Sequence, residues 1–540
     1  MRLKFFALSL LLICGSLQAN SKKPNVIIFL VDDLGWADIS LRGAPIDTPN
    51  IDSLFKEGIT LDRFYATPIC SPTRAALMTG RDPMRLGIAY GVVMPWMNNG
   101  IHPDEHFMPE SFKAENYQTA IVGKWHLGHS QQIFHPNARG FDNFYGHMHT
   151  EVGYFPPFAN QGGIDFQRNG VTISDQGYET FLLAEEATRW IEGRDEAKPF
   201  FLYMPFIAPH SPLEAPDNLI EKYADLEDTR QLTRSASIDR TRTLNGFSPS
   251  ARPLYAAVVD ALDQAIGEVL QTLESEGIEE ETIILFTSDN GGAAYAGGGA
   301  DNFPLRGGKG DTYEGGIRVV AAMKWKGVLK PGGSFDSIMT VMDVFPTLAQ
   351  AADVPMLNTK DLWGRDMWDA IESQKHKKLS KDVFFASETP NYGEFHTTVF
   401  NDKWKLVQVI TSSLMEIKVQ NKRFNINEDP NEYSDLSQQY PKLVILMAEK
   451  IRKWRALHPI AGTRTQLVPP PGWRAPKDWS TYTIPLEELQ DDASLGFGAW
   501  AHQILDFLIK DHGRIIYDCE PSDWERGKCK KIKKTEVHEH

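Results

Sequence analysis

Cysteine is scarce in this chain, with four residues among 540. So few cysteines exclude a small fold that disulfide bonds hold together. Positive charge is also in deficit, because 56 lysines and arginines face 71 aspartates and glutamates and leave a formal net charge of −15. Such a chain is a poor partner for nucleic acid through its whole-surface field, so any anionic ligand needs a local basic pocket.

Long apolar runs are absent after the N-terminus, whereas a membrane-spanning helix needs about 20 apolar residues. The N-terminus has a basic start at residues 1–4, an apolar run at 5–14 and small residues within 16–19. This pattern is typical of a secretory signal peptide over residues 1–19, cleaved after Ala19. It predicts an exported protein, periplasmic or extracellular, without a membrane span.

Export to an oxidising compartment affects how the remaining cysteines are interpreted. Cys519 and Cys529 lie close together in the sequence and can pair in an oxidising compartment. Cys70 is then left alone. A lone cysteine is more often a buried, unreactive thiol than a reactive group, so its neighbours have to decide between the two interpretations.

Continuous apolar runs of strand length recur in the first two thirds of the chain. They cover residues 25–31, 118–122, 200–206 and 282–287, and such runs are typical of parallel strands buried on both faces. Residues 254–273 place apolar side chains on one face at helical spacing. Strands that alternate with helices predict an α/β fold with a large, mostly parallel central sheet sandwiched by helices.

The chain is long enough for two domains, and its 42% hydrophobic and 24% charged residues are ordinary for a globular protein. Residues 20–375 carry the strand and helix alternation and form the predicted catalytic domain. Residues 376–460 form a predicted smaller C-terminal α+β domain built on an antiparallel sheet. Residues 461–540 begin as an extended wrap rich in proline and tryptophan and end as a basic tail.

Local sequence patterns support the smaller domain. Residues 382–387 and 397–410 alternate like short antiparallel strands, and the second run is broken at Asn401 and Asp402. Residues 441–457 have the spacing of an amphipathic helix that lies on those strands.

Acidic residues follow two of the predicted strands directly. Asp32 and Asp33 end the first, and Asp289 and Asn290 end the last. Ligands bind beyond the carboxyl ends of strands in parallel sheets, and adjacent buried carboxylates are costly unless a cation neutralises them. This all-oxygen set suits Ca²⁺ or Mg²⁺ better than Zn²⁺. For either pair alone, helix capping or turn formation explains the residues equally well.

The stretch Cys-Ser-Pro-Thr-Arg at residues 70–74 leads into an Ala/Leu-Met-Thr-Gly run that ends at Gly80. It resembles the signature of type I, formylglycine-dependent sulfatases, in the alkaline phosphatase superfamily. Residues 117–128, with Gly-Lys-Trp-His-Leu-Gly at their end, resemble the family's second signature. Further segments that resemble the family are residues 25–35, 209–210, 287–292, 305–318, 343–347 and 424–436.

The resemblance implies a particular nucleophile at position 70. Cys70 would be oxidised to formylglycine by a formylglycine-generating enzyme, and Pro72 and Arg74 match the residues that this enzyme needs. The hydrated aldehyde can attack sulfur and then expel sulfate by re-forming the aldehyde, whereas a plain thiol would be trapped as a stable adduct.

The resemblance also implies one calcium ion. Asp32, Asp33, Asp289 and Asn290 match its ligands, and the modified Cys70 completes the shell. The cation would polarise the sulfate and lower the pKa of the nucleophilic diol.

The remaining roles follow by position within the matching motifs. Arg74 matches a residue that stabilises the diol, Asp289 can take a diol proton, and His126 matches the partner of the second diol hydroxyl. Lys124 and Lys309 match sulfate-binding lysines. His210 matches the histidine near the leaving oxygen, where it would bind substrate and act as general acid. The competing candidates for one further polar role are His147, His149 and Thr150.

The substrate is a separate question. Residues 80–109 and 123–128 resemble the arylsulfatase B-like branch, whose members remove 4-sulfates from galactose-type sugars. This analogy predicts an extracellular sulfated carbohydrate, a carrageenan-type galactan or a glycosaminoglycan. Candidate aromatic residues for stacking on sugar rings are Trp96, Tyr154, Phe155 and Trp363, for each of which core packing is the competing interpretation.

Two other functions compete with sulfate-ester hydrolysis. A phosphonate or phosphate-diester hydrolase can use the same scaffold, although relatives of that kind usually carry serine or threonine nucleophiles and more metal ligands. A non-catalytic relative that only binds sulfated glycans is the second alternative. The full set of Arg74, Lys124, His126, His210 and Lys309 argues against it.

Overall fold

The computed structural model describes residues 22–149, 152–230, 251–294, 298–359, 361–389, 394–412, 417–459 and 469–483, and two short strands at 517–518 and 530–531. The predicted signal peptide (residues 1–19), Thr150, Cys519 and Cys529 lie outside the described residues. Within the described part of the chain, none of the helices has the length and apolar character of a membrane span.

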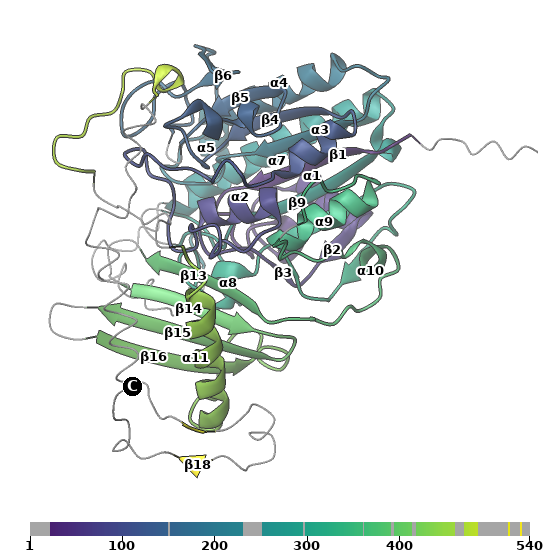
Figure 1. Ribbon diagram of the computed structural model, residues 1–540. Helices are drawn as coiled ribbons and strands as arrows, with labels where there is room; N and C mark the ends of the chain where they lie inside the picture. The colour runs from purple at the N-terminus through teal and green to yellow at the C-terminus, as the bar shows by residue number, and fades with distance from the viewer. Residues whose placement is uncertain are drawn as a thin grey trace, which may run out of the picture.

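A ten-stranded sheet forms the centre of the larger part of the molecule (Figure 1). Its middle five strands are parallel, in the order β9-β1-β8-β4-β5. Their bounds are Thr282–Ser288 (β9), Asn25–Val31 (β1), Phe200–Pro205 (β8), Gln118–Lys124 (β4) and Asn143–His147 (β5). The predicted parallel sheet is therefore confirmed, and four of these five strands were predicted from their apolar runs.

Short strands extend the sheet at both edges. Strand β10 runs antiparallel to β9 and is followed by β2 and β11, whereas β6 and β7 form antiparallel pairs beyond β5. Their bounds are Ala321–Lys324 (β10), Ile59–Leu61 (β2), Gly333–Phe335 (β11), Gln167–Arg168 (β6) and Val171–Thr172 (β7).

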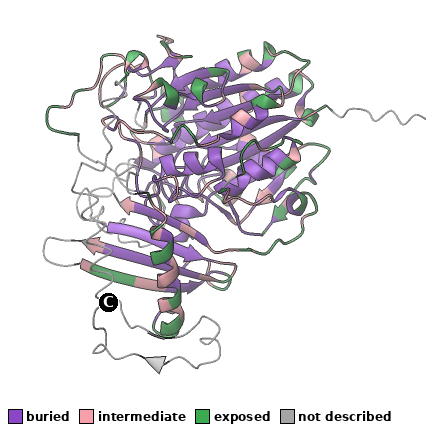
Figure 2. Ribbon diagram, viewed as in Figure 1, coloured by how far each residue is buried: buried purple, intermediate pink, exposed green. Residues whose placement is uncertain are grey.

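Both faces of the sheet are covered by helices. The even-numbered residues of β1 enter one apolar cluster with α2, α3, α9 and α10, and its odd-numbered residues from Ile27 onward enter another with α1, α4, α5 and α7. Figure 2 shows the resulting buried centre. The helix bounds are Pro49–Glu57 (α1), Cys70–Thr79 (α2), Met108–Ala114 (α3), Glu179–Glu192 (α4), Asp217–Lys222 (α5), Ala251–Ser275 (α7), Val341–Ala351 (α9) and Trp368–Glu372 (α10). The helix predicted at 254–273 is α7.

A separate antiparallel sheet follows in the C-terminal part (Figure 1). Its four strands are consecutive, and α11 (Pro441–Arg455) packs against them through Met447 and Ile451. The strand bounds are Val383–Thr389 (β13), Glu394–Phe400 (β14), Trp404–Ser412 (β15) and Ile417–Asn425 (β16). The break predicted at Asn401 and Asp402 is the turn between β14 and β15. Strand β16 was not predicted, because its first half is polar and largely exposed.

A buried ion network joins this sheet to the part of the molecule that contains the ten-stranded sheet. Lys405 Nζ on β15 lies 2.8 Å from Glu314 Oε1 and 2.9 Å from Glu432 Oε1, and all three side chains are inaccessible to solvent. The Tyr65 hydroxyl donates to Glu314 Oε2 at 3.0 Å. Breaking a buried pair of this kind leaves an uncompensated charge, so the network keeps the two sheets together.

The remaining elements are short. Two-stranded pairs are β3 (Phe64–Tyr65) with β12 (Met339–Thr340) and β17 (Tyr517–Asp518) with β18 (Lys530–Lys531). Single turns of helix are η1 (Ser40–Arg42), η2 (Gln132–Phe134), η3 (Pro136–Ala138), η4 (Glu279–Glu281), α8 (Glu314–Ile317) and η5 (Trp479–Thr481).

Glu388 on β13 gives the C-terminal sheet a pH-dependent stability. Burial raises the pKa of Glu388 to about 7. The folded protein therefore holds this proton more tightly than the unfolded chain, and it loses stability as the pH rises from about 4 to about 7. We expect Glu388→Gln to match the wild type at pH 4 and to exceed its free energy of unfolding at pH 8, by up to about 3 kcal/mol.

Urea denaturation at both pH values measures this difference. Glu372→Gln, at an exposed position on α10, is the matched control and should show no pH-dependent gain. An advantage of Glu388→Gln that stays constant between the two pH values would contradict the assignment.

Candidate active site

The carboxyl ends of β1 and β9 bring the two acidic pairs together. Asp289 N donates to Val31 O at 2.9 Å, so the residues that follow the two strands start side by side. Asp33 N donates to Asp289 Oδ1 at 3.3 Å, and Asn290 Nδ2 donates to Asp33 Oδ1 at 2.7 Å. All of these side chains are buried, so the structure unites the two pairs in the way their positions predict.

The backbone after β1 is strained at this point. Asp33 adopts a φ of 68°, in the left-handed region that non-glycine residues rarely occupy. The neighbouring Asp32 N donates to Ala208 O at 3.1 Å, which ties this turn to the loop that carries His210. Strain of this kind persists only where the surroundings hold it, and it is concentrated at functional sites.

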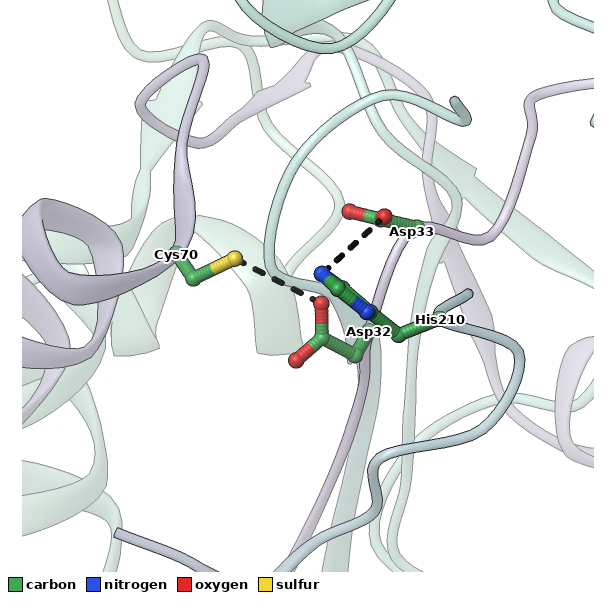
Figure 3. Close-up of side chains that lie close together, drawn as sticks. All are labelled: Asp32, Asp33, Cys70 and His210. Atoms are coloured by element: carbon green, nitrogen blue, oxygen red, sulfur yellow. Dashed lines mark hydrogen bonds and ion pairs between the residues drawn. The ribbon is translucent and has the colours of Figure 1, made fainter. Parts of the chain in front are cut away.

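Cys70 is the first residue of α2 and points at the acidic turn (Figure 3). Ile69 before it is extended, and the bend is held by a bond from Thr67 N to Thr73 Oγ1 at 3.0 Å. The Cys70 thiol donates to Asp32 Oδ1 at 3.5 Å. Burial, with Asp289 and Asp32 nearby, raises the pKa of this thiol well above its ordinary value. Position 70 is also the N-terminal residue of a ten-residue helix, where the helix dipole favours negative charge.

Arg74 follows Cys70 by four residues and so lies on the same face of α2. Its Nη2 lies 2.8 Å from Asp32 Oδ2 and 3.1 Å from Asp289 Oδ2, and its Nη1 donates to Lys124 O at 3.0 Å. Burial raises the pKa of Asp289 to about 7, with a further contribution from the charge of Asp32. The guanidinium offsets two buried carboxylates at once, which no lysine could do from the same backbone position.

Two lysines complete the positive lining. Lys124 Nζ lies 2.5 Å from Asp32 Oδ2, and Lys309 Nζ lies 2.8 Å from Asp33 Oδ2. Burial raises the pKa of Asp32, but Lys124, His210 and Arg74 together hold it well below its ordinary value. These cations are the local positive charge that an anionic ligand needs in a chain of net charge −15.

The residue before Lys124 must be glycine. Gly123 has a φ of 133°, and a Cβ on it would lie 2.2 Å from Pro205 O on the neighbouring strand. The close approach of β4 and β8 therefore depends on the Gly-Lys pair of the second signature.

His126 lies just beyond the end of β4. It adopts a left-handed φ of 61°, its N donates to Met148 O at 3.0 Å, and its Nε2 lies 3.1 Å from Val93 O. With the proton on Nε2 for that bond, Nδ1 is a buried atom without a hydrogen-bond partner among the described residues. Burial, reinforced by Lys124 and Arg74, lowers the pKa of His126 well below its ordinary value, so the ring is neutral.

His210 enters the site from the loop after β8 (Figure 3). Its Nε2 lies 3.7 Å from Asp33 Oδ2, and its Nδ1 bonds to Ser211 O at 2.5 Å. Burial lowers the pKa of His210, and Lys309 lowers it further. Tyr154 supports this loop, because its hydroxyl donates to His210 O at 2.8 Å.

The site has the composition of a cation site. Among the described residues, one group of histidine, cysteine and acidic side chains has ligand atoms within 4.8 Å of one another: Asp32, Asp33, Cys70 and His210. Asn290 Oδ1 is buried without a hydrogen-bond partner in the described structure, although its Nδ2 is bonded. An oxygen acceptor left open beside three carboxylates fits a hard cation such as calcium.

Sequence reasoning missed the residues that support this site. Ser71 Oγ donates to His126 O at 2.9 Å and accepts from Val93 N at 3.2 Å, so it connects α2 to the loop over residues 91–98. His129 Nε2 lies 3.2 Å from Pro95 O in the same loop. No local pattern marks these contacts, because each joins residues more than 20 positions apart.

Some candidates of the sequence analysis take other roles. Tyr154 is fully buried and stacks on Tyr178, so the core-packing interpretation is correct for it and it offers no face to a sugar. Trp363 N donates to Gly80 O, beyond the far end of α2, which is about 14 Å from Cys70 along the helix. The His147 ring is fully buried, with Nε2 3.3 Å from Glu179 Oε1.

Comparisons with known proteins agree with this geometry. Residues 24–354 match the sulfatase family. Arylsulfatase J of Mus musculus is 29% identical over 480 residues, which span 81% of this chain and 76% of that protein. N-acetylgalactosamine-6-sulfatase of Mus musculus is 32% identical over 399 residues, which span 69% of this chain and 70% of that protein.

Solved structures of Ps i-CgsB share the fold. One is 30% identical with a TM-score of 0.69, covering 81% of this chain and 94% of that one. A second, in complex with k-i-k-neocarrahexaose, is 28% identical with a TM-score of 0.69, covering 87% of this chain and 100% of that one. Since the family match spans residues 24–354 of the 540, the chain belongs to the sulfatase family of the alkaline phosphatase superfamily, and it is a sulfuric ester hydrolase.

Proposed function

We propose that this enzyme hydrolyses sulfate esters on an extracellular sulfated carbohydrate, with a formylglycine made from Cys70 and one bound calcium ion. The observation that carries the proposal is the placement of Cys70. Its Sγ lies 3.5 Å from Asp32 Oδ1, inside the group that also contains Asp33 and His210. A residue in this position can reach a sulfate held by the surrounding cations.

Two groups supplied after translation would complete the site. Formylglycine at position 70 supplies a hydrated aldehyde oxygen as nucleophile and a route for sulfate to leave again. Asp32, Asp33, Asp289, Asn290 and position 70 would hold calcium, which would supply Lewis acidity toward the sulfate oxygens.

The chain's own side chains supply the remaining chemistry. Lys124 and Lys309 hold their ammonium groups beside Asp32 and Asp33, where they can bind the equatorial sulfate oxygens. Arg74 holds Asp32 and Asp289 in place. Together these cations counter the charge that develops in the transition state.

Proton transfer falls to the two histidines. His210 Nδ1 donates its proton to Ser211 O, so Nε2 is the nitrogen that faces the site and carries the lone pair of the neutral ring. It can give a proton to the leaving oxygen only in the imidazolium form, which the Asp33 carboxylate 3.7 Å away favours. His126 has an open Nδ1, which can exchange a proton with the group at position 70. We assign no role in proton transfer to His147 or His149.

The calcium proposal predicts a ligand-dependent stability. A cation that binds the folded state alone stabilises it by about 2.7 kcal/mol at a concentration a hundredfold above its Kd. We expect calcium to raise the Tm of the wild type, and Asn290→Leu to need at least about tenfold more calcium for the same shift, because it loses one oxygen ligand.

Thermal denaturation at a series of calcium concentrations measures the two responses. Asn401→Ala, in the turn between β14 and β15, is the matched control and should keep the calcium response of the wild type. Equal calcium dependence in Asn290→Leu and the wild type would remove Asn290 from the ligand set.

The substrate proposal draws on the relatives. One relative is named for the sugar N-acetylgalactosamine, and Ps i-CgsB has been solved in complex with k-i-k-neocarrahexaose. With the resemblance to the arylsulfatase B-like branch, these favour a galactose-type substrate, a carrageenan-type galactan or a glycosaminoglycan. The signal peptide expected from the sequence favours a location outside the cytoplasm, where such polymers occur.

Sulfate release from a panel of defined substrates tests the function. The panel contains sulfated galactan and chondroitin oligosaccharides, other sulfated sugars, an aryl sulfate and an aryl phosphonate. We expect sulfate from the galactose-type sugars and little turnover of the phosphonate. Faster cleavage of the phosphonate than of every sulfate ester would refute the proposal, and sulfate release from other sugars alone would refute the galactose assignment.

A further inference from the structure

Residues 469–483, here called the C-terminal strap, return from the smaller sheet to the catalytic part of the molecule. Figure 1 shows the strap as a yellow-green segment that reaches the β6 edge of the large sheet. Ile164 N donates to Lys477 O at 3.0 Å, Trp479 N donates to Ile164 O at 2.9 Å, and Thr172 Oγ1 donates to Asp478 Oδ1 at 2.5 Å. Backbone and side-chain bonds thus anchor one end of the strap.

Trp479 fixes the strap to two buried histidines, His129 and His149. Its ring is buried and lies 4.0 Å from the His149 ring centroid and 5.3 Å from that of His129, and its Nε1 donates to Gly162 O at 3.0 Å. His129 in turn binds Pro95 O in the loop over residues 91–98. Strap and catalytic residues therefore share one supporting loop.

That loop carries a tryptophan which meets the strap. Trp96 lies three residues after Val93, whose carbonyl oxygen is 3.1 Å from His126 Nε2. The rings of Trp96 and Trp473 lie 5.6 Å apart with an interplanar angle of 75°. Both side chains are partly exposed, so the two rings form an aromatic corner that solvent and ligands can reach. Partly exposed aromatic side chains near a site are typical of surfaces that bind a ligand with one apolar face.

The strap also concentrates positive charge. Arg474 and Lys477 are exposed and form no ion pair within the described ranges of the chain. The neighbouring Asp478 is engaged by Thr172 and Ser480. In a chain of net charge −15, two unneutralised cations beside an aromatic corner favour an anionic ligand with apolar faces.

We propose that Trp96, Trp473, Arg474 and Lys477 form a subsite for the sugar units next to the one that undergoes hydrolysis. The inference rests on the proposed function and deepens it: the substrate is an oligosaccharide or polysaccharide with more than one sulfate. The tryptophans bind the apolar face of a neighbouring sugar ring, and the two cations bind its sulfate. The strap, far from the catalytic residues in sequence, thus selects chains over single sugars.

Binding to the full-length Cys70→Ala protein tests the subsite without turnover. The probes are k-i-k-neocarrahexaose, a chondroitin sulfate hexasaccharide and galactose 4-sulfate, each titrated by calorimetry. We expect at least one hexasaccharide to bind about tenfold or more tighter than the monosaccharide. Trp473→Ala and Trp96→Ala should each remove most of that advantage, since an aromatic anchor carries a large share of binding energy.

Trp363→Ala, beyond the far end of α2, is the matched control and should keep the hexasaccharide advantage. Arg474→Ala combined with Lys477→Ala should weaken hexasaccharide binding at low ionic strength and less so at high salt, because exposed charges are screened. Loss of affinity in both tryptophan variants, which lie on separate segments, distinguishes the subsite from local damage to the strap.

Two results would overturn the inference. One is a hexasaccharide advantage that survives both tryptophan variants, and the other is no preference for either hexasaccharide over the monosaccharide. Sulfate release by the wild type from galactose 4-sulfate and an aryl sulfate is measured in parallel. If it occurs while the subsite tests fail, the proposed function stands and only the subsite is wrong.

Discussion

Replacing Cys70 by alanine should abolish sulfate release, with a loss on the order of 10⁴ or more in kcat, because removal of a catalytic nucleophile has effects of that size. Cys70 starts α2, and its Sγ is 3.5 Å from Asp32 Oδ1, so its side chain reaches the centre of the candidate cation site. Alanine keeps the helix and leaves no atom that could attack sulfur.

The Cys70→Ser variant tests whether the chemistry of the side chain at position 70, and not only its size, is required. In a host that modifies only cysteine, Cys70→Ser should be as inactive as Cys70→Ala, although a hydroxyl replaces a thiol of similar size. The mass of the tryptic peptide over residues 64–74 of the wild type reports the modification directly. Wild-type rates in Cys70→Ser, or an unmodified thiol in fully active enzyme, would contradict the proposed nucleophile.

Replacing Arg74 by alanine should destabilise the fold and inactivate the enzyme together. The guanidinium is wholly buried between Asp32 and Asp289, at 2.8 and 3.1 Å. Removing one partner of such a cluster leaves uncompensated buried charge, which costs about 3–5 kcal/mol. We expect a loss of that size in the free energy of unfolding, measured by chemical denaturation in the absence of calcium.

Two further variants serve as comparisons for the Arg74→Ala measurement. Arg74→Lys keeps the charge but cannot reach both carboxylates, so it should recover part of the stability and little of the activity. Arg168→Ala removes a partly exposed arginine paired with Glu186, a contact expected to contribute about 0–1 kcal/mol. If Arg74→Ala were no less stable than Arg168→Ala, the buried charges would be neutralised in another way.

The sequence by itself determined the framework of this protein. Continuous apolar runs predicted the parallel strands β1, β4, β8 and β9, because strands buried on both faces are mostly apolar. The same runs placed Asp32 and Asp289 at strand ends on one edge. The resemblance assigned Cys70 and Arg74 to one motif, and the structure places both on one face of α2, since residues four apart share a helix face.

Only the tertiary structure decided which distant residues complete the site. The loop after β8 brings His210 into the cation group, and Ser71 joins Val93 to His126. Tyr154 fits an aromatic platform by residue type, but its ring is in the core. The physical reason is common to all of these cases: sequence patterns report periodic burial, whereas contacts between loops depend on how the packed elements approach one another.

The C-terminal strap shows the same division most clearly. Its proline and tryptophan content predicted an extended wrap but gave no partner for any ring. The fold places Trp479 against His149 and Trp473 against Trp96, more than 300 positions away in the chain. Such contacts have no local signature, because the strap is held by backbone bonds to the catalytic part and not by a periodic apolar face.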